Sequence, residues 1–103
     1  MKIHYKNPLP APALFLLRAA GYAPFTDPKS GEESFVRRLA GEFYPRFHLY
    51  VKEAGGVTTF DLHLDQKKPS YEGSRMHAGE YDGPLIEAEM TRIKSAFRAT
   101  NAS

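Results

Sequence analysis

Length, composition and charge limit what this chain can be. It has 103 residues, 42% of them hydrophobic, so it can bury one modest core and we expect a single domain over residues 1–103. The absence of cysteine excludes disulfides, a thiol nucleophile and a cysteine zinc site. A net charge of +2 lacks the basic excess of a dedicated nucleic-acid-binding protein.

The first apolar run predicts a helix over residues 12–21. Pro12 suits a first helical turn and Gly21 a left-handed helix end. The run is apolar nearly all round, so we expect this helix to be buried. Arg18 cuts it well short of the ~20 apolar residues that a membrane span requires, which favours a cytoplasmic protein without membrane contact.

The segments beside this helix carry weaker signals. The start of the chain, MKIHYKN, shows no clear pattern, and we expect it to be mobile, with His4 an ordinary residue of that start. The stretch YAPFTDPKS, residues 22–30, contains two prolines and an Asp-Pro turn signal. We therefore interpret it as a connection.

Residues 34–40 fit two kinds of structure. Ser30 with Glu33 forms a capping box and Gly41 could end a helix, so local rules favour a helix. However, a lone two-stranded hairpin is only marginally stable, and this segment is where a third strand would come from. We favour the strand and leave the helix open.

Residues 46–65 predict a β-hairpin closed by Gly55-Gly56. Apolar and polar residues alternate on both sides of the two glycines, and glycine readily adopts the positive φ angles of a two-residue turn. With that turn, every apolar residue meets an apolar one, and a slip by one residue would destroy the match. The expected pairs are Phe47 with Leu64, Leu49 with Leu62, Val51 with Phe60, Arg46 with Asp65, His48 with His63, and Tyr50 with Asp61.

The end of the chain predicts a second helix, which begins near Pro84 and is followed by a frayed tail, ATNAS. Its apolar stripe consists of Ile86, Met90, Ile93 and Phe97, whereas Glu87, Arg92, Lys94 and Arg98 are expected to face water. The fold class that follows is α+β. It is a small antiparallel β-meander of two or three strands, packed on one face by an N-terminal and a C-terminal helix in the order α-β-β-β-α.

With three strands, this order resembles the double-stranded RNA-binding domain in topology alone. That family has a cluster of lysines at the start of its last helix, where this chain has Gly83, Pro84, Leu85, Ile86 and Glu87. A shared topology does not imply a shared function, so no functional residue is carried over from that family.

The polar face of the hairpin, together with the long connection 67–83, is the candidate site. Polar residues on one face of an antiparallel sheet are also expected without any function. Connections as long as 67–83 are usually functional or disordered, and we hypothesise that this one folds over the sheet. The candidate ligand-binding residues are Arg46, His48, Tyr50, Asp61, His63, Asp65, Lys67, Lys68, Tyr71 and His77.

Binding of a polyanion, a nucleic acid or a small ligand is the function we favour over catalysis. Aromatic rings such as Tyr50 and Tyr71 would stack on bases. A protein-interaction module is a third possibility, with a homodimer formed through a sheet edge. The bases that would contact phosphates are Arg37, Arg38, Arg46, Lys67, Lys68 and Arg75.

The alternative is a small enzyme that depends on histidine or on a divalent metal. His48, His63 and His77 would be the metal ligands, and zinc is the metal that such ligands suit, although no known zinc-ligand spacing is present. Without a metal, a histidine beside Asp61 would act as a general base. No hydroxyl stands in a recognisable nucleophile motif, which disfavours covalent catalysis.

Overall fold

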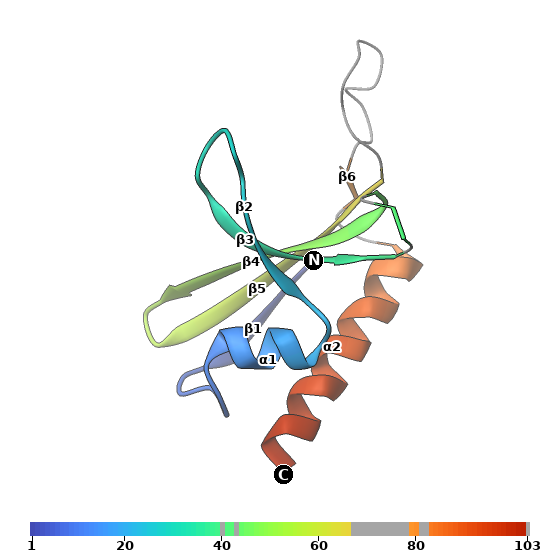
Figure 1. Cartoon of the computed structure of the whole chain (residues 1–103). Coiled ribbons are helices and arrows are strands. Elements are labelled where there is room, and N and C mark those ends of the chain that lie inside the picture. The colour runs from blue at the N-terminus through green and yellow to red at the C-terminus, as the bar shows by residue number, and fades with distance from the viewer. Residues whose placement is uncertain (40, 43, 67–78, 81–82, 103) are drawn as a thin grey trace.

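The structure is a computed structural model that describes residues 1–39, 41, 42, 44–66, 79, 80 and 83–102 (Figure 1). Strands and helices are mixed along the chain, which agrees with the α+β class expected from the sequence. In chain order the elements are β1 (Lys2–Lys6), α1 (Ala13–Ala19), β2 (Ala23–Thr26), β3 (Glu33–Arg38), β4 (Arg46–Ala54), β5 (Val57–Asp65), β6 (Gly79–Glu80) and α2 (Pro84–Ala102).

The strands form one antiparallel sheet that is larger than predicted. Five strands lie in the order β1-β5-β4-β3-β2, and the two-residue strand β6 pairs with the end of β5. The expectation of two or three strands is therefore wrong. The topological resemblance to the double-stranded RNA-binding domain does not hold either, because β1 precedes α1 and β2 follows it directly.

The two unpredicted strands come from segments that were expected to be irregular. β1 pairs with β5 from Lys2 opposite Asp61 to Lys6 opposite Val57, so the start of the chain is an edge strand rather than a mobile segment. β2 pairs with β3 and forms the opposite edge. Its four residues include Pro24, which an edge strand tolerates because one side of that strand has no partner strand.

The central hairpin has the predicted register throughout. All six predicted pairs are present between β4 and β5, and Ala54 lies opposite Val57 with two residues between them. Gly55 and Gly56 have φ values of 59° and 77°, as a tight hairpin turn requires. Residues 33–38 form β3 and pair with β4, so the strand interpretation of this region is confirmed and the helix is wrong.

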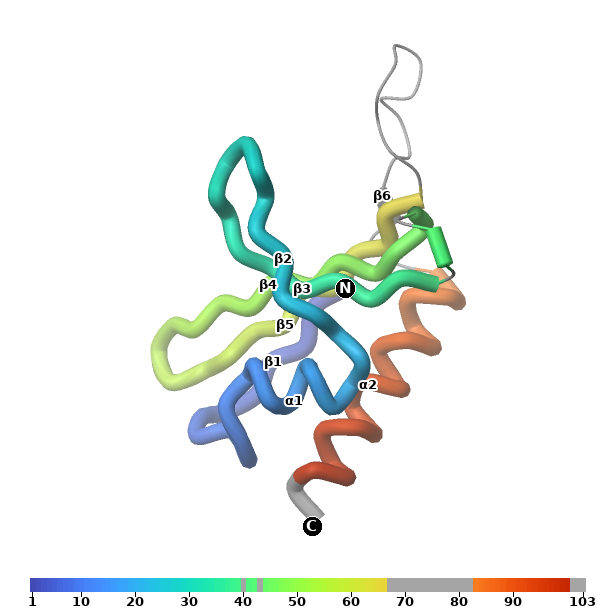
Figure 2. The backbone as a smooth tube through the Cα atoms, viewed as in Figure 1, coloured from blue at the N-terminus to red at the C-terminus, as the bar shows by residue number. Residues whose placement is uncertain are grey.

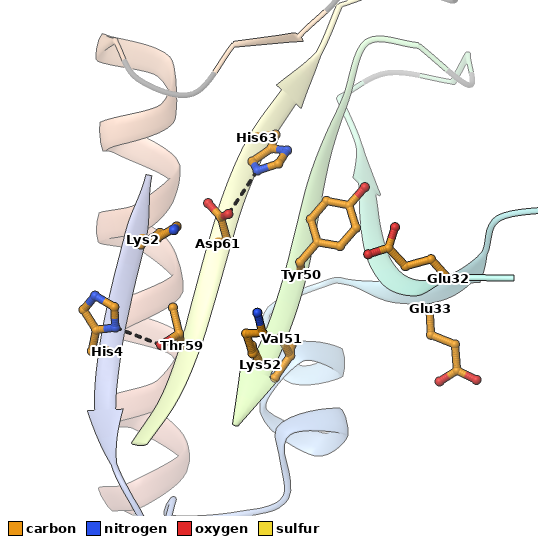
Figure 3. A pocket seen from close by; sticks show the side chains of 10 residues that line it. All are labelled: Lys2, His4, Glu32, Glu33, Tyr50, Val51, Lys52, Thr59, Asp61 and His63. Carbon is orange, nitrogen blue, oxygen red and sulfur yellow. Dashed lines mark hydrogen bonds and ion pairs between the residues drawn. The ribbon is translucent and has the colours of Figure 1, made fainter. Parts of the chain in front are cut away.

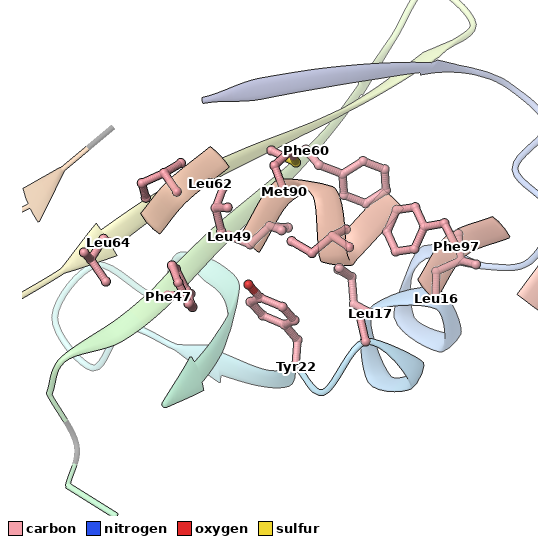
Figure 4. Packing of buried hydrophobic residues seen from close by; sticks show 13 residues of the cluster. Leu16, Leu17, Tyr22, Phe47, Leu49, Phe60, Leu62, Leu64, Met90 and Phe97 are labelled. Carbon is pink, nitrogen blue, oxygen red and sulfur yellow. The ribbon is translucent and has the colours of Figure 1, made fainter. Parts of the chain in front are cut away.

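Both helices pack on the same face of the sheet and enclose the core between helix and strand (Figures 1 and 4). The predicted stripe of α2 is confirmed, since each of its four residues is at most 4% exposed. Phe60 packs edge-on against Phe97 with ring centroids 5.2 Å apart. The buried apolar residues are Leu16, Leu17, Ala20, Tyr22, Phe47, Leu49, Phe60, Leu62, Leu64, Ile86, Met90, Ile93 and Phe97.

Two expectations about the helices are wrong. α1 is buried only on one side, because Leu14 and Phe15 are 37% and 59% exposed while Leu16 and Leu17 are inside. α2 continues through Ala102, so most of the expected frayed tail is helical.

Glu89 of α2 is buried on the helix-covered side of the sheet and is bound by three side chains. The hydroxyl of Tyr22 donates to it at 2.7 Å, Arg37 of β3 donates at 3.2 Å, and Arg92 donates at 2.8 and 2.9 Å. Arg92 also donates to the Ala20 carbonyl at 2.6 Å, so it joins this network instead of only facing water. Glu89 thereby ties α2 to β3 and to the segment that follows α1.

Candidate functional site

The face of the sheet opposite the helices is polar and is bounded on one side by the β2–β3 hairpin. The tip of this hairpin projects on the side of the sheet away from α1 and α2 (Figures 1 and 2). A cleft of about 540 Å³ lies over β1, β5 and β4 on this face (Figure 3). Its lining residues are Lys2, His4, Glu32, Glu33, Tyr50, Val51, Lys52, Thr59, Asp61 and His63.

Aromatic rings lie side by side along the polar face. Tyr50 stacks on His48 with ring centroids 4.6 Å apart and contacts His63 at 5.2 Å. The two cross-strand histidines therefore both contact Tyr50. Their carboxylate partners differ, because Nδ1 of His48 lies 3.0 Å from Asp65 and Nε2 of His63 lies 3.4 Å from Asp61.

His48 belongs to a chain of hydrogen bonds that crosses three strands. Its Nε2 lies 2.7 Å from the hydroxyl of Ser34 on β3, and Asp65, which it contacts through Nδ1, also accepts from Nε of Arg46 at 3.2 Å. Burial on its own would raise the pKa of Asp65, but the hydrogen bonds and charges of His48 and Arg46 outweigh it and lower that pKa. The ionised carboxylate therefore favours a proton on Nδ1 of His48, which leaves Nε2 to accept from the Ser34 hydroxyl.

The order serine, histidine, aspartate is that of a catalytic triad, but access to the serine differs. Ser34 is only 4% exposed and is not among the residues that line the cleft. A nucleophile must contact the atom that it attacks, so this geometry serves first to hold β3 against β4 and β5.

Arg46 is buried and hardly exposed to solvent. It is 5% exposed, and its guanidinium lies over the rings of Phe25 at 4.9 Å and Tyr44 at 4.7 Å. Arg37 is likewise committed to Glu89 on the other side of the sheet. Two of the bases expected to contact phosphates are therefore used inside the fold.

Charges of both signs line the cleft, with a lysine at one end and a glutamate at the other. Lys2 lies on β1 and Glu32 directly precedes β3, while Asp61 on β5 and Lys52 on β4 lie between them (Figure 3). Burial raises the pKa of Tyr50, and the nearby negative charge of Glu32 raises it further. The Tyr50 hydroxyl is thus near the Glu32 end of the cleft.

The predicted site residues are only partly brought together. Tyr50, Asp61 and His63 line the cleft, while Arg46, His48 and Asp65 form the adjacent hydrogen-bonded chain. The described residues contain no group of three or more histidines and carboxylates arranged to hold a metal ion. The remaining predicted residues, Lys67, Lys68, Tyr71 and His77, lie outside the described residues, as does most of the 67–83 connection.

Several residues of this face were not predicted from the sequence. Lys2 and His4 were missed because β1 was missed, and Ser34 because no motif surrounds it. Lys52 does carry a signal, since it continues the polar alternation of His48 and Tyr50 along β4.

Comparison with known proteins gives no further guidance, because no family model matches the chain and neither curated proteins nor solved structures give a significant match. In the described part of the chain, neither helix is long and apolar enough to cross a membrane.

Proposed function

We propose that this domain is a binding module for a small polar ligand, which it holds in the cleft on the polar face of the sheet. The observation that carries the proposal is the cleft itself. Its volume of about 540 Å³ falls within the roughly 300–1,000 Å³ of small-molecule sites. It lies on three paired strands, which hold its residues at fixed positions.

The lining suits a polar ligand better than an apolar one. The rings of Tyr50 and His63 offer flat surfaces for stacking, and Thr59, Asp61 and Lys52 offer hydrogen-bonding groups of several kinds. A few polar groups that converge on a cleft fix the orientation of a ligand and give it specificity.

A polyanion is less well supported among the described residues. Arg37 and Arg46 are engaged with carboxylates, and the cleft carries Glu32, Glu33 and Asp61 beside its bases. Phosphate backbones require clustered positive charge, so acids in the same cleft oppose their binding. Binding of nucleic acid through residues 67–83 stays a prediction.

Edge pairing with a second chain is also disfavoured by the two outer strands. Pro24 in β2 has no backbone N–H to donate, and β1 carries Lys2 and Lys6. Proline and lysine on edge strands are common devices against edge-to-edge pairing.

Binding would be tested by NMR, with amide spectra recorded during a screen of small polar fragments. We expect shifts that cluster at Tyr50, Thr59, Asp61 and His63, and loss of those shifts in Tyr50→Thr, which keeps a residue suited to strands. Phe15→Ala is the matched control, because it truncates an exposed aromatic residue on α1, on the other side of the sheet. Shifts scattered over the surface, or equal in both variants, would contradict the proposal.

A hydrolase is the second candidate, and it rests on the chain Ser34, His48 and Asp65 alone. In acyl transfer the Ser34 oxygen would bond to the carbonyl carbon while its proton passes to Nε2 of His48, and the bond from that carbon to the leaving group would break as the leaving group takes this proton. Water that gives a proton to His48 would then attack the Ser34 ester and release the acid, and the proton would return to the Ser34 oxygen. Labelling by a fluorophosphonate probe that is lost in both Ser34→Ala and His48→Gln would support it. Absence of labelling on the folded protein would remove it.

A further inference from the structure

The proposed binding cleft has a positive side chain at one end and a negative one at the other, which narrows the class of ligand. The inference drawn from these charges rests on the proposed function. Lys2 lies on the β1 side and Glu32 on the side of the β2–β3 hairpin, and the carboxylate of Glu32 is turned toward Tyr50 (Figure 3). Within the described ranges, neither Lys2 nor Glu32 forms an ion pair. Both charges are thus available to a ligand.

The strand register gives a scale for the separation of these charges. Lys2 lies opposite Asp61, and Asp61 lies opposite Tyr50, so β1, β5 and β4 contribute successive residues of one row. β3, which Glu32 directly precedes, is the next strand in the sheet. Three strand spacings of about 4.8 Å, with an offset of two residues along the strands, separate Lys2 from Glu32 by roughly 16 Å at the backbone.

The side chains of Lys2 and Glu32 reach into the cleft, so the distance between their charged groups is shorter than the backbone separation and matches the length of a small peptide. An extended chain spans about 3.3–3.6 Å per residue, so three residues cover roughly 10–11 Å. We infer that the cleft binds an extended zwitterion of the size of a free tripeptide, with its ammonium group near Glu32 and Tyr50 and its carboxylate near Lys2.

Of the groups between the two ends, Tyr50 favours this orientation. The charges of Asp61 beside Lys2 and of Lys52 on β4 act against it. The Tyr50 ring attracts a cation through its π face, and Glu32 adds a negative charge beside it. Asp61, His63 and Thr59 lie along the middle of the cleft, where the peptide N–H and C=O groups of the ligand would need partners. A ligand bound the other way round would place its carboxylate beside Glu32, which is unfavourable.

The test uses triglycine, N-acetyl-triglycine, triglycine amide and the doubly blocked peptide, each titrated into the full chain and followed by NMR. Triglycine is expected to bind most tightly, and each blocked end should weaken binding by about two- to fivefold, as expected for an exposed ion pair. Lys2→Gln should remove the penalty for amidation alone, and Glu32→Gln the penalty for acetylation alone. Lys94→Gln and Glu87→Gln, on exposed positions of α2, are the matched controls.

The possible failures are distinguishable. If blocked and free peptides bind equally, or if the penalties are unchanged in Lys2→Gln and Glu32→Gln, the zwitterion inference is wrong, whereas fragments that still shift Tyr50 and His63 would leave the binding cleft standing. If neither peptides nor fragments shift the cleft residues, both proposals fail.

Discussion

The two faces of the sheet each hold a carboxylate beside arginine, in different surroundings. Glu89, on the helix side, has a side chain that is 3% exposed and binds Arg37, Arg92 and Tyr22. Asp65, on the polar face, is 22% exposed and binds Arg46 and His48. For both, burial would raise the pKa, but the bound donors and positive charges lower it.

The difference lies in what each network connects. The partners of Glu89 come from positions as far as 67 residues away, and they join a helix to a strand and to a connecting segment. The partners of Asp65 all lie on the sheet, next to the cleft. The first network therefore fixes the packing of elements, whereas the second fixes the rings and charges of one surface.

The largest expected effect contrasts two neighbours on β5 that face opposite sides. Phe60→Ala removes a fully buried ring that packs on Phe97, and we expect a loss of about 3–5 kcal/mol in the free energy of unfolding. Thr59→Ala, on the polar face, should cost no more than ~0.5–1.5 kcal/mol, the value of one hydrogen bond with His4. Urea denaturation measures both, and similar losses would show that the polar face is packed as firmly as the core.

The next effect concerns Glu89 itself. Glu89→Gln should destabilise the protein by about 2 kcal/mol, below the ~3–5 kcal/mol of a fully buried pair, because Arg37 and Arg92 reach solvent. Glu87→Gln, on an exposed position of the same helix, should have almost no effect. Equal denaturation midpoints for the two variants would mean that the network does not fix the helix.

Acid should reveal the same network. The folded pKa of Glu89 is lowered, so its contribution to stability is fully present above the unfolded value of about 4.3 and is lost as the pH falls through the folded pKa. The wild type should therefore lose more unfolding free energy than Glu89→Gln between about pH 5 and pH 2. Parallel pH profiles would contradict the lowered pKa.

Asp65→Asn should have a smaller effect on stability than Glu89→Gln, at about 1–2 kcal/mol, because its surroundings are wetter. Its local effect should be larger, since the carboxylate orients His48. We expect the imidazole NMR signals of His48 to move and those of His4 to stay in place. Unchanged His48 signals would show that the ring is held by Tyr50 and Phe25 instead.

The smallest effect is expected for Ser34→Ala. It removes the hydrogen bond to His48 and a long contact of 3.4 Å to the Phe25 carbonyl, so we expect a loss of about 0.5–1.5 kcal/mol by urea denaturation. Ser30→Ala, in the exposed turn before β3, is the control, since the hydrogen bond that its hydroxyl accepts from the Glu32 amide is exposed to water and its loss should cost less. A gain in stability would indicate that Ser34 is strained for a purpose other than packing.

The parts of the fold that could be predicted are those whose signal lies within one segment. The register of β4 with β5 follows from strict alternation on both sides of Gly55-Gly56, and the stripe of α2 follows from helical spacing. β1 and β2 are short edge strands. Whether such strands form depends on the partner strands that receive them, which no local pattern reveals.

The candidate site was only partly predictable for the same reason. Asp61 and His63 were found because the hairpin register places them, whereas Lys2 joins the cleft through β1 and Glu32 through the turn between β2 and β3, and neither β1 nor β2 was predicted. Glu89 did carry a signal, because it lies three residues after Ile86 and four before Ile93, inside the apolar stripe. A carboxylate at that spacing predicts a buried partner.

The pairing of β1 with β5 bears on how the chain is made. His4 bonds to Thr59, which is 55 residues further on, and at ~5–20 residues per second a ribosome takes roughly 3–11 s to reach it. During that time the residues of β1 have been made but β5, the strand with which they pair, has not. The lysines of β1 at positions 2 and 6 keep the nascent segment charged on the face that later borders the cleft, which protects it from pairing with other growing chains.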